Sequence, residues 1–210
     1  LVAGITILSA VGSISGEIES GTLQALAVRP LSRRSLLLGK FWGQAALLLL
    51  YTWVLFLLLV ALVRWQLGFT APEVGRTLFL FSLEPLALLA LAFWGSTTLS
   101  TAGNGVLCFA LYALALTGGM VEQVGALVDN AGAIYVGVVT SLILPTDSLY
   151  RRLVAEVVAL LPAPAEHSFP ALSPHHFLGP FGALSTPSNW MLLYTLLYAA
   201  LMLAVAVYRF

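Results

Sequence analysis

Long apolar runs separated by short polar breaks make up most of the chain. Four such runs cover residues 36–63, 77–99, 106–128 and 190–208, and a shorter one fills residues 1–14. A helix needs about 20 mostly apolar residues to cross the hydrocarbon core of a bilayer. The four longer runs reach that length, and the shorter run is long enough for part of a span. The pattern predicts an all-α polytopic membrane protein with five spans, the first of them partial.

Residues 131–188 depart from this pattern. Residues 131–144 are apolar but too short for an ordinary crossing, and Pro145 ends them. Residues 146–161 alternate charged and apolar positions at helical spacing, which predicts an amphipathic helix. Residues 162–187 are rich in proline and predict a loop. We expect an extracytoplasmic re-entrant helical pair followed by this loop, and a full crossing by 131–144 stays open as the alternative.

The orientation of the spans is predicted from the basic residues. Arg29, Arg33 and Arg34 lie between the first two apolar runs, and Lys40 lies near the start of the second. Cytoplasmic loops carry an excess of Lys and Arg, so residues 15–35 are predicted to be cytoplasmic. Alternation then places a tight turn of small residues (STAGNG, 100–105) in the cytoplasm and residues 131–188 outside. Arg151 and Arg152 count against this orientation, because it leaves both outside.

Composition narrows the class of protein further. The chain has 210 residues, of which 60% are hydrophobic and 9% are charged, and its mean hydropathy is +0.99. Soluble domains carry about 25% charged residues, so neither a soluble globular fold nor disorder fits. Nine basic and nine acidic residues balance, and no basic run indicates a nucleic-acid partner. A location in the cell membrane, in contact with lipid, is expected.

The polar segment at 15–35 has features of a short surface helix between two spans. Glu17 and Glu19 lie at its start, where negative charge suits the helix dipole. Pro30 disfavours helix at Arg29, and Ser32 can cap the helix that follows. A rigid helix held between two spans can transmit force from a cytoplasmic partner to the membrane segment.

Three strings in this region carry a family resemblance. EIESGTLQAL (17–26), RPLSRR (29–34) and GK (39–40) resemble the signature loop of ABC-2 type transporter permeases, in particular the bacterial branch connected with multicopper-enzyme maturation. The positions that match this pattern are Glu19, Gly21, Thr22, Leu23, Pro30, Ser32, Arg33, Gly39 and Lys40. The resemblance implies an ATPase-coupling role for Glu17, Glu19, Gly21, Thr22, Leu23, Arg29, Pro30, Ser32 and Arg33.

The same resemblance implies a fold and partners. It implies the type V ABC exporter fold, in which the loop is a coupling helix that docks into a separate ATPase subunit. A second permease copy, or a homologous permease, completes the pathway, and a re-entrant helical pair precedes the last span. The family's first span and the interfacial helix before it have no counterpart, so we expect the chain to lack the first transmembrane span.

The implied function is export across the membrane by alternating access. No phosphate-binding loop of the G-x-x-x-x-G-K-[ST] type occurs in the chain, so ATP is expected on the partner and no cofactor on this chain. We therefore expect a transporter subunit and not an enzyme. Two alternatives stay open: a polytopic membrane enzyme, and a membrane scaffold that recruits an ATPase without transport.

Several other polar residues are candidates for a site. Glu84 lies in mid-span, where a charge is costly. A polar helix contact or a kink with Pro85 is favoured for it over a place in the substrate pathway. Glu122 and Asp129 are expected to be solvated at the membrane interface.

Two further groups complete the candidates. Three histidines, His167, His175 and His176, fit no zinc spacing, so no metal site is expected. Gly118 and Gly119, and the small residues of the turn at 100–105, are expected to allow close approach of another helix.

Overall fold

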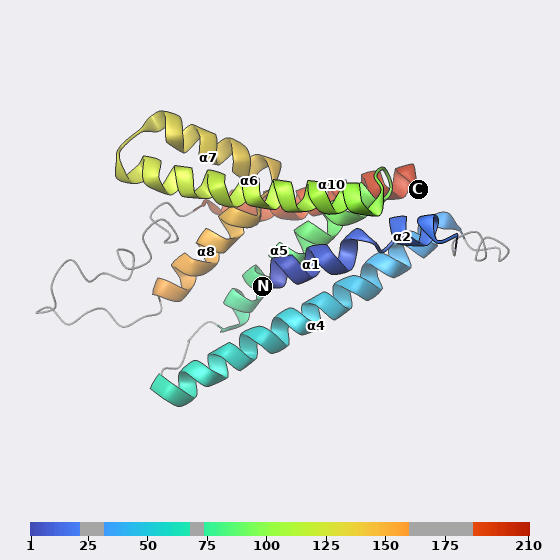
Figure 1. The fold of residues 1–210 in the computed structure, drawn as a ribbon. Helices are drawn as coiled ribbons and strands as arrows, with labels where there is room; N and C mark the ends of the chain where they lie inside the picture. The colour runs from blue at the N-terminus through green and yellow to red at the C-terminus, as the bar shows by residue number, and fades with distance from the viewer. Residues whose placement is uncertain (22–31, 68–73, 160–186) are drawn as a thin grey trace, which may run out of the picture. The chain divides into compact units, whose positions relative to one another are not determined.

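The fold was analysed in a computed structural model, which describes residues 1–21, 32–67, 74–159 and 187–210. Within these ranges all regular secondary structure is helical. The helices are α1 (Val2–Val11), α2 (Ser15–Glu19), α4 (Arg33–Leu67), α5 (Val74–Ser96), α6 (Thr101–Leu127), α7 (Ala131–Ile143), α8 (Thr146–Ala159) and α10 (Asn189–Arg209) (Figure 1). The all-helical fold expected from the apolar runs is confirmed for the described residues.

Four of these helices are long and apolar enough to cross a membrane: α4, α5, α6 and α10. Helices α4 and α10 extend beyond their predicted apolar runs at both ends. Helices α5 and α6 begin and end earlier than their runs. The pair α7 and α8 is bent by 107° at the break between them, which fits either a broken span or a re-entrant loop. The chain therefore has four or five candidate spans among the described residues.

The predicted turn at 100–105 is wrong in its position. Helix α6 already begins at Thr101, and the turn lies over residues 97–100. Ser100 is the reason, since its hydroxyl oxygen accepts a hydrogen bond from the Gly103 backbone N–H at 3.3 Å, as an N-cap residue does. The small residues Gly103 and Gly105 are helical instead of forming the turn. A Cβ at Gly105 would lie 3.5 Å from Val11, so this part of α6 passes close to the end of α1.

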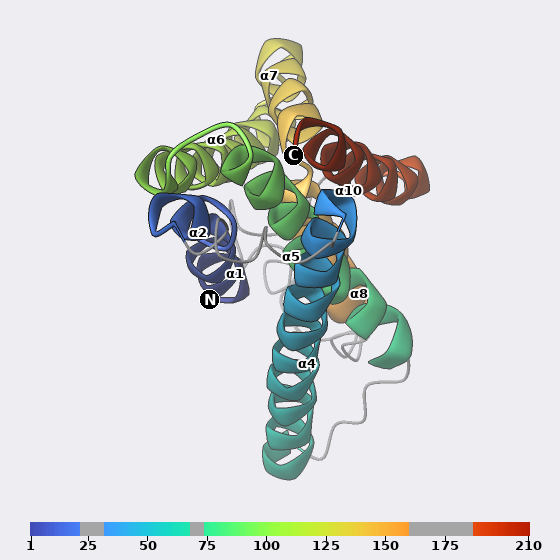
Figure 2. The same cartoon turned by 90° about the vertical axis from the view of Figure 1, so that its right-hand side faces the viewer.

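The chain divides into two compact units. Unit 1 comprises residues 1–55, 82–111 and 193–210, and unit 2 comprises residues 56–81 and 112–192. The second half of α5 is the core of unit 1, because every side chain from Ala87 to Phe93 is at most 1% exposed. Phe93 makes an edge-on ring contact with Phe41 of α4, with ring centroids 5.3 Å apart. Within unit 1, Figure 2 shows α1 and α2 following one another beside the first turns of α6.

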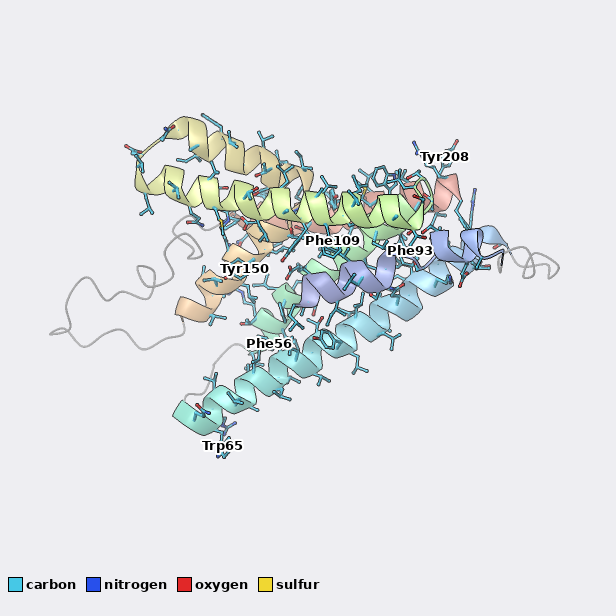
Figure 3. All side chains as sticks on the ribbon, in the orientation of Figure 1. Phe56, Trp65, Phe93, Phe109, Tyr150 and Tyr208 are labelled. Atoms are coloured by element: carbon cyan, nitrogen blue, oxygen red, sulfur yellow. The ribbon has the colours of Figure 1, made fainter. Side chains whose placement is uncertain are left out.

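The exposure of apolar side chains differs among the four long helices. In the most apolar stretch of α5, 67% of the residues are buried, against 11% in α4, 28% in α6 and 17% in α10. Large apolar side chains such as Trp65 and Tyr208 stand out from the ends of their helices (Figure 3). Such surface is stable in lipid, where apolar side chains need no shielding from water. The helices other than α5 thus carry the apolar surface expected of a membrane protein.

Candidate functional site

Helix α2 is the first part of the predicted coupling segment, and it contacts α4. Glu17 of α2 forms an ion pair with Lys40 of α4, with 2.5 Å between Oε1 and Nζ. The Lys40 ammonium also donates a hydrogen bond to the backbone carbonyl of Ser13, just before α2. Both charged side chains are about one-third exposed, at 33% for Glu17 and 29% for Lys40. Lys40 therefore connects α2 and Ser13, just before it, to the first turns of the long helix α4.

The backbone around α2 and α4 explains why two of the predicted residues occur there. Gly21 has a φ of +72°, a left-handed conformation that glycine adopts without strain and that turns the chain away from α2. Ser32 precedes α4, and its hydroxyl oxygen accepts a hydrogen bond from the Ser35 backbone N–H at 3.2 Å. The capping role predicted for Ser32 is confirmed by this contact.

The remaining predicted coupling residues fall into two groups. Glu19 is the last residue of α2, and Arg33 is the first residue of α4. Thr22, Leu23, Arg29 and Pro30 lie outside the described residues. The contact between Glu17 and Lys40 thus holds α2, at the start of the segment, next to α4, which follows it.

A cavity of about 600 Å³ adjoins this junction between α1 and α4. Its walls are largely apolar, with Ile5 on one helix and Leu47 and Leu48 on the other. Glu17 and Lys40 line its polar end. The ion pair therefore borders the cavity on one side.

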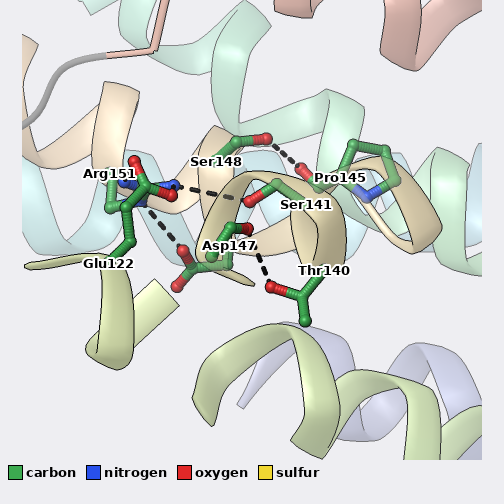
Figure 4. Close-up of polar contacts among 8 residues, drawn as sticks. Glu122, Thr140, Ser141, Pro145, Asp147, Ser148 and Arg151 are labelled. Atoms are coloured by element: carbon green, nitrogen blue, oxygen red, sulfur yellow. Dashed lines mark hydrogen bonds and ion pairs between the residues drawn. The ribbon is translucent and has the colours of Figure 1, made fainter. Parts of the chain in front are cut away.

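A buried polar cluster in unit 2 was not predicted. Arg151 of α8 forms an ion pair with Glu122 of α6, with Nη1–Oε1 and Nη2–Oε2 distances of 2.6 and 2.9 Å (Figure 4). Its Nε lies 2.9 Å from Asp147 Oδ2, one turn earlier on α8. The side chains of Arg151, Glu122 and Asp147 are only 4%, 9% and 8% exposed. We call these three residues the Arg151 cluster.

Glycines make this burial possible. A Cβ at Gly119 would lie 1.8 Å from an Asp147 carboxylate oxygen, and one at Gly118 would lie 1.9 Å from the Thr140 hydroxyl. A Cβ at Gly137 would lie 2.2 Å from Glu122 Cβ. The close helix approach predicted at Gly118 and Gly119 is confirmed. The solvated position predicted for Glu122 is wrong, because α7 and α8 fold over this face of α6 and bring Arg151 to it.

Glu84, the predicted intramembrane carboxylate, lies half-buried in α5, directly before the buried Pro85. Among the described residues, no group of three His, Cys, Asp or Glu side chains is close enough to hold a metal ion. His167, His175 and His176 lie outside those residues.

Comparison with known proteins decides the family. A family model described as "ABC-2 family transporter protein" matches residues 1–210. The chain belongs to the ABC-2 transporter family. No curated protein and no solved structure matches it significantly. The resemblance to ABC-2 type permeases is thereby confirmed, and the branch within them stays a prediction.

Membership of this family identifies the chain as a permease subunit of an ABC transporter. Its several long apolar helices fit a multi-pass membrane protein. Permeases of this family normally work with an ABC ATPase partner. The chain is thus a membrane subunit and not a catalytic enzyme.

A second polar group in unit 2 joins helix ends of the permease. Arg152 donates hydrogen bonds to the Pro187 carbonyl at 2.8 Å and to Asn189 Oδ1 at 2.7 Å, at the start of α10. Its neighbour on α8, Glu156, pairs with Arg76 at the start of α5 at 2.9 Å. The amphipathic pattern of 146–161 predicted α8 but not these partners, since they come from distant parts of the sequence.

Proposed function

We propose that this permease subunit exports its substrate by alternating access, driven by ATP on a separate ATPase subunit that docks at α2 and the segment after it. The observation that carries this proposal is the Glu17–Lys40 pair. It joins the start of the segment that matches the family's signature loop to the first transmembrane helix after that segment. A push on α2 therefore reaches α4 without passing through the intervening residues.

The distribution of charge supports a cytoplasmic position for this junction. Within unit 1, Figure 1 shows α2, the start of α4, the end of α5, the start of α6 and the end of α10 gathered at one end. That end carries Arg34, Lys40 and Arg209. Basic residues concentrate on the cytoplasmic side of membrane proteins, so this end is assigned to the cytoplasm.

The proposed movement follows from this placement. Closure of two ATPase subunits displaces α2, and Lys40 passes the displacement to the start of α4. Because α4 exposes most of its apolar side chains, most of its surface stays in lipid when it tilts, and only the face that carries Phe41 must repack against α5. A second permease copy or a homologous permease forms the other wall of the pathway. The tilt then changes the side of the membrane to which the pathway opens.

The helical pair α7 and α8 is assigned to the outer side as a re-entrant element. Helix α7 has 13 residues. At about 1.5 Å per residue it spans roughly 20 Å, less than the ~30 Å hydrocarbon core. Its bend of 107° against α8 fits a chain that enters the membrane and returns. With the pair on the outer side, α10 runs back to the cytoplasm.

Reconstitution tests the proposal. The complete permease and its ATPase are inserted into vesicles, and movement of a fluorescent phospholipid and of a hydrophobic cationic dye is followed with and without ATP. The proposal predicts ATP-dependent movement of at least one probe, and none with an ATPase whose phosphate-binding loop is inactivated. Recruitment of the ATPase without any movement supports the scaffold alternative, and chemical conversion of a probe without the ATPase supports the enzyme alternative.

A further inference from the structure

A single backbone carbonyl at the end of α1 collects an unusual number of side-chain donors. Val11 is the last residue of α1, and its carbonyl oxygen accepts hydrogen bonds from the hydroxyls of Ser15 at 3.0 Å and Ser96 at 2.9 Å. The side-chain amide of Asn104 donates a third bond at 3.2 Å. The last carbonyls of a helix lack intrahelical partners, and these three donors satisfy this one. We call Val11, Ser15, Ser96 and Asn104 the Val11 cluster.

Asn104, on α6, connects this carbonyl to α5. Its amide nitrogen also lies 2.9 Å from the Ala92 carbonyl of α5 and 2.8 Å from the Ser96 hydroxyl, so its two N–H groups are shared among three acceptors. The side chain is fully buried, at 0% exposed, and Cys108 contributes a weak thiol hydrogen bond to its Oδ1. One residue of α6 is therefore bonded at once to α1 and to α5, all within unit 1.

The cluster sits at the point where α1 turns into α2. Ser15, the first residue of α2, belongs to it, and its hydroxyl also shares a hydrogen bond of 2.9 Å with Thr101 at the start of α6. Thr101, Asn104, Gly105 and Cys108 follow one another at helical spacing on the side of α6 that meets this turn. Any displacement of α2 must therefore move this face of α6 or break these hydrogen bonds.

We infer that Asn104 is a positioning residue for transport, which passes the movement of α2 to the α5–α6 hairpin. This inference rests on the proposed function. The Glu17–Lys40 pair links α2 to α4 at a contact that is about one-third exposed. Asn104 instead joins α5 and α6 to the Val11 carbonyl, which Ser15 of α2 also bonds, through buried contacts. Without the second link, the ATPase moves α2 and α4 while the α5–α6 side of the pathway stays in place.

Gly95 provides a steric counterpart to Asn104. A Cβ at Gly95 would lie 2.0 Å from Asn104 Oδ1, so alanine at this position must displace the amide. Gly95→Ala should therefore reproduce the effect of Asn104→Ala. The double variant should be no worse than Asn104→Ala alone, because the removed side chain leaves room for the new methyl group. Such non-additivity is the evidence that a coupling network requires.

The test measures transport per ATP hydrolysed by the complete permease with its ATPase in vesicles, using the fluorescent phospholipid and the dye as probes. We expect Asn104→Ala to keep ATP hydrolysis within about twofold of wild type and to lower the ratio of transport to hydrolysis at least tenfold. Thr98→Ala is the control, because Thr98 lies in the turn after α5 and its hydroxyl bonds carbonyls at the end of that helix, away from the Val11 cluster. It should keep the wild-type ratio.

A second measurement reports the link itself. Spin labels at Ser20→Cys on the α2 side and Val106→Cys on α6, in a Cys108→Ser background that keeps a donor to Asn104, should give one narrow distance with and without ATP when Asn104 is present. The Asn104→Ala variant should broaden it. An unbroadened distance, or an unchanged transport ratio, overturns the inference. Absence of ATP-dependent transport in the wild type instead overturns the proposed function, and the label distances identify which of the two has failed.

Discussion

Two ion-pair sites in this permease differ in the way they are held. The Glu17–Lys40 pair is about one-third exposed and borders a cavity of about 600 Å³. The Arg151 cluster is less than 10% exposed and is enclosed by glycines. Exposed ion pairs contribute about 0–1 kcal/mol to stability, whereas loss of one partner of a buried pair costs about 3–5 kcal/mol. The partly exposed Glu17–Lys40 pair lies where the ATPase is proposed to act. The buried Arg151 cluster lies where α6, α7 and α8 pack closely.

The largest effect is expected at the Arg151 cluster. Arg151→Met leaves Glu122 and Asp147 buried without a cation, so we expect a loss of about 3–5 kcal/mol in the free energy of unfolding. The measurement is reversible unfolding in mixed micelles. Arg152→Met is the matched control: this side chain is 17% exposed, more than Arg151, and its loss should cost much less. Equal losses for the two variants would show that the deeper burial of Arg151 adds nothing to the stability.

A smaller loss is expected from filling the glycine contact under the same cluster. In Gly137→Ala the new methyl group would lie 2.2 Å from Glu122 Cβ and 2.8 Å from the Gly118 carbonyl, and neither atom can move freely. Overpacking of this kind costs about 1–3 kcal/mol. Gly43→Ala, on α4, meets no atom within 4 Å and should be neutral or slightly stabilising. Unfolding in the same micelles compares the two, and a neutral Gly137→Ala would refute the close approach.

At the coupling junction, Gly21 should be more important for transport than for stability. Gly21→Val forces a β-branched residue into a left-handed conformation, at a cost of about 1–2 kcal/mol, and redirects the chain that leaves α2. We expect loss of ATP-dependent transport while the ATPase still binds ATP. Gly21→Asn, which tolerates this conformation, should retain most of the activity. If the valine variant transports normally, the exit from α2 has no coupling role.

The smallest effect on stability is expected for the exposed pair. Glu17→Gln removes a charge that is about one-third exposed, so the free energy of unfolding should change by less than about 1 kcal/mol. Transport should nevertheless fall severalfold, because α2 is no longer tied to α4. The charge exchange Glu17→Lys with Lys40→Glu should recover part of it. A large loss of stability without any loss of transport would reverse the contrast between the two sites.

Local sequence patterns predicted the helices well and their contacts poorly. Apolar runs give the four long helices directly, because a helix in lipid must satisfy its own backbone and expose apolar side chains. Ser32 and Gly118–Gly119 were predicted because capping and close approach depend on residue type. The turn before α6 was misplaced by a few residues because its small residues serve helix packing.

The buried contacts required the tertiary structure. Glu122 looked like an interfacial carboxylate, since its partner Arg151 is 29 residues away on a helix whose pattern suggests an exposed surface. Asn104 looked like a turn residue for the same reason: its partners Val11 and Ala92 lie on other helices. Periodicity shows which face of a helix is polar, but it does not show which distant helix covers that face.

The central claim is that the α2 junction lies in the cytoplasm, where an ATPase acts on it. Single cysteines test this most directly in a Cys108→Ala background, with Ser20→Cys beside α2 and Val128→Cys at the exposed α6–α7 turn. A membrane-impermeant maleimide is added to sealed vesicles of each orientation. The account predicts that Ser20→Cys reacts only from the cytoplasmic side and Val128→Cys only from the opposite side. Reaction of Ser20→Cys from the outer side would contradict the account.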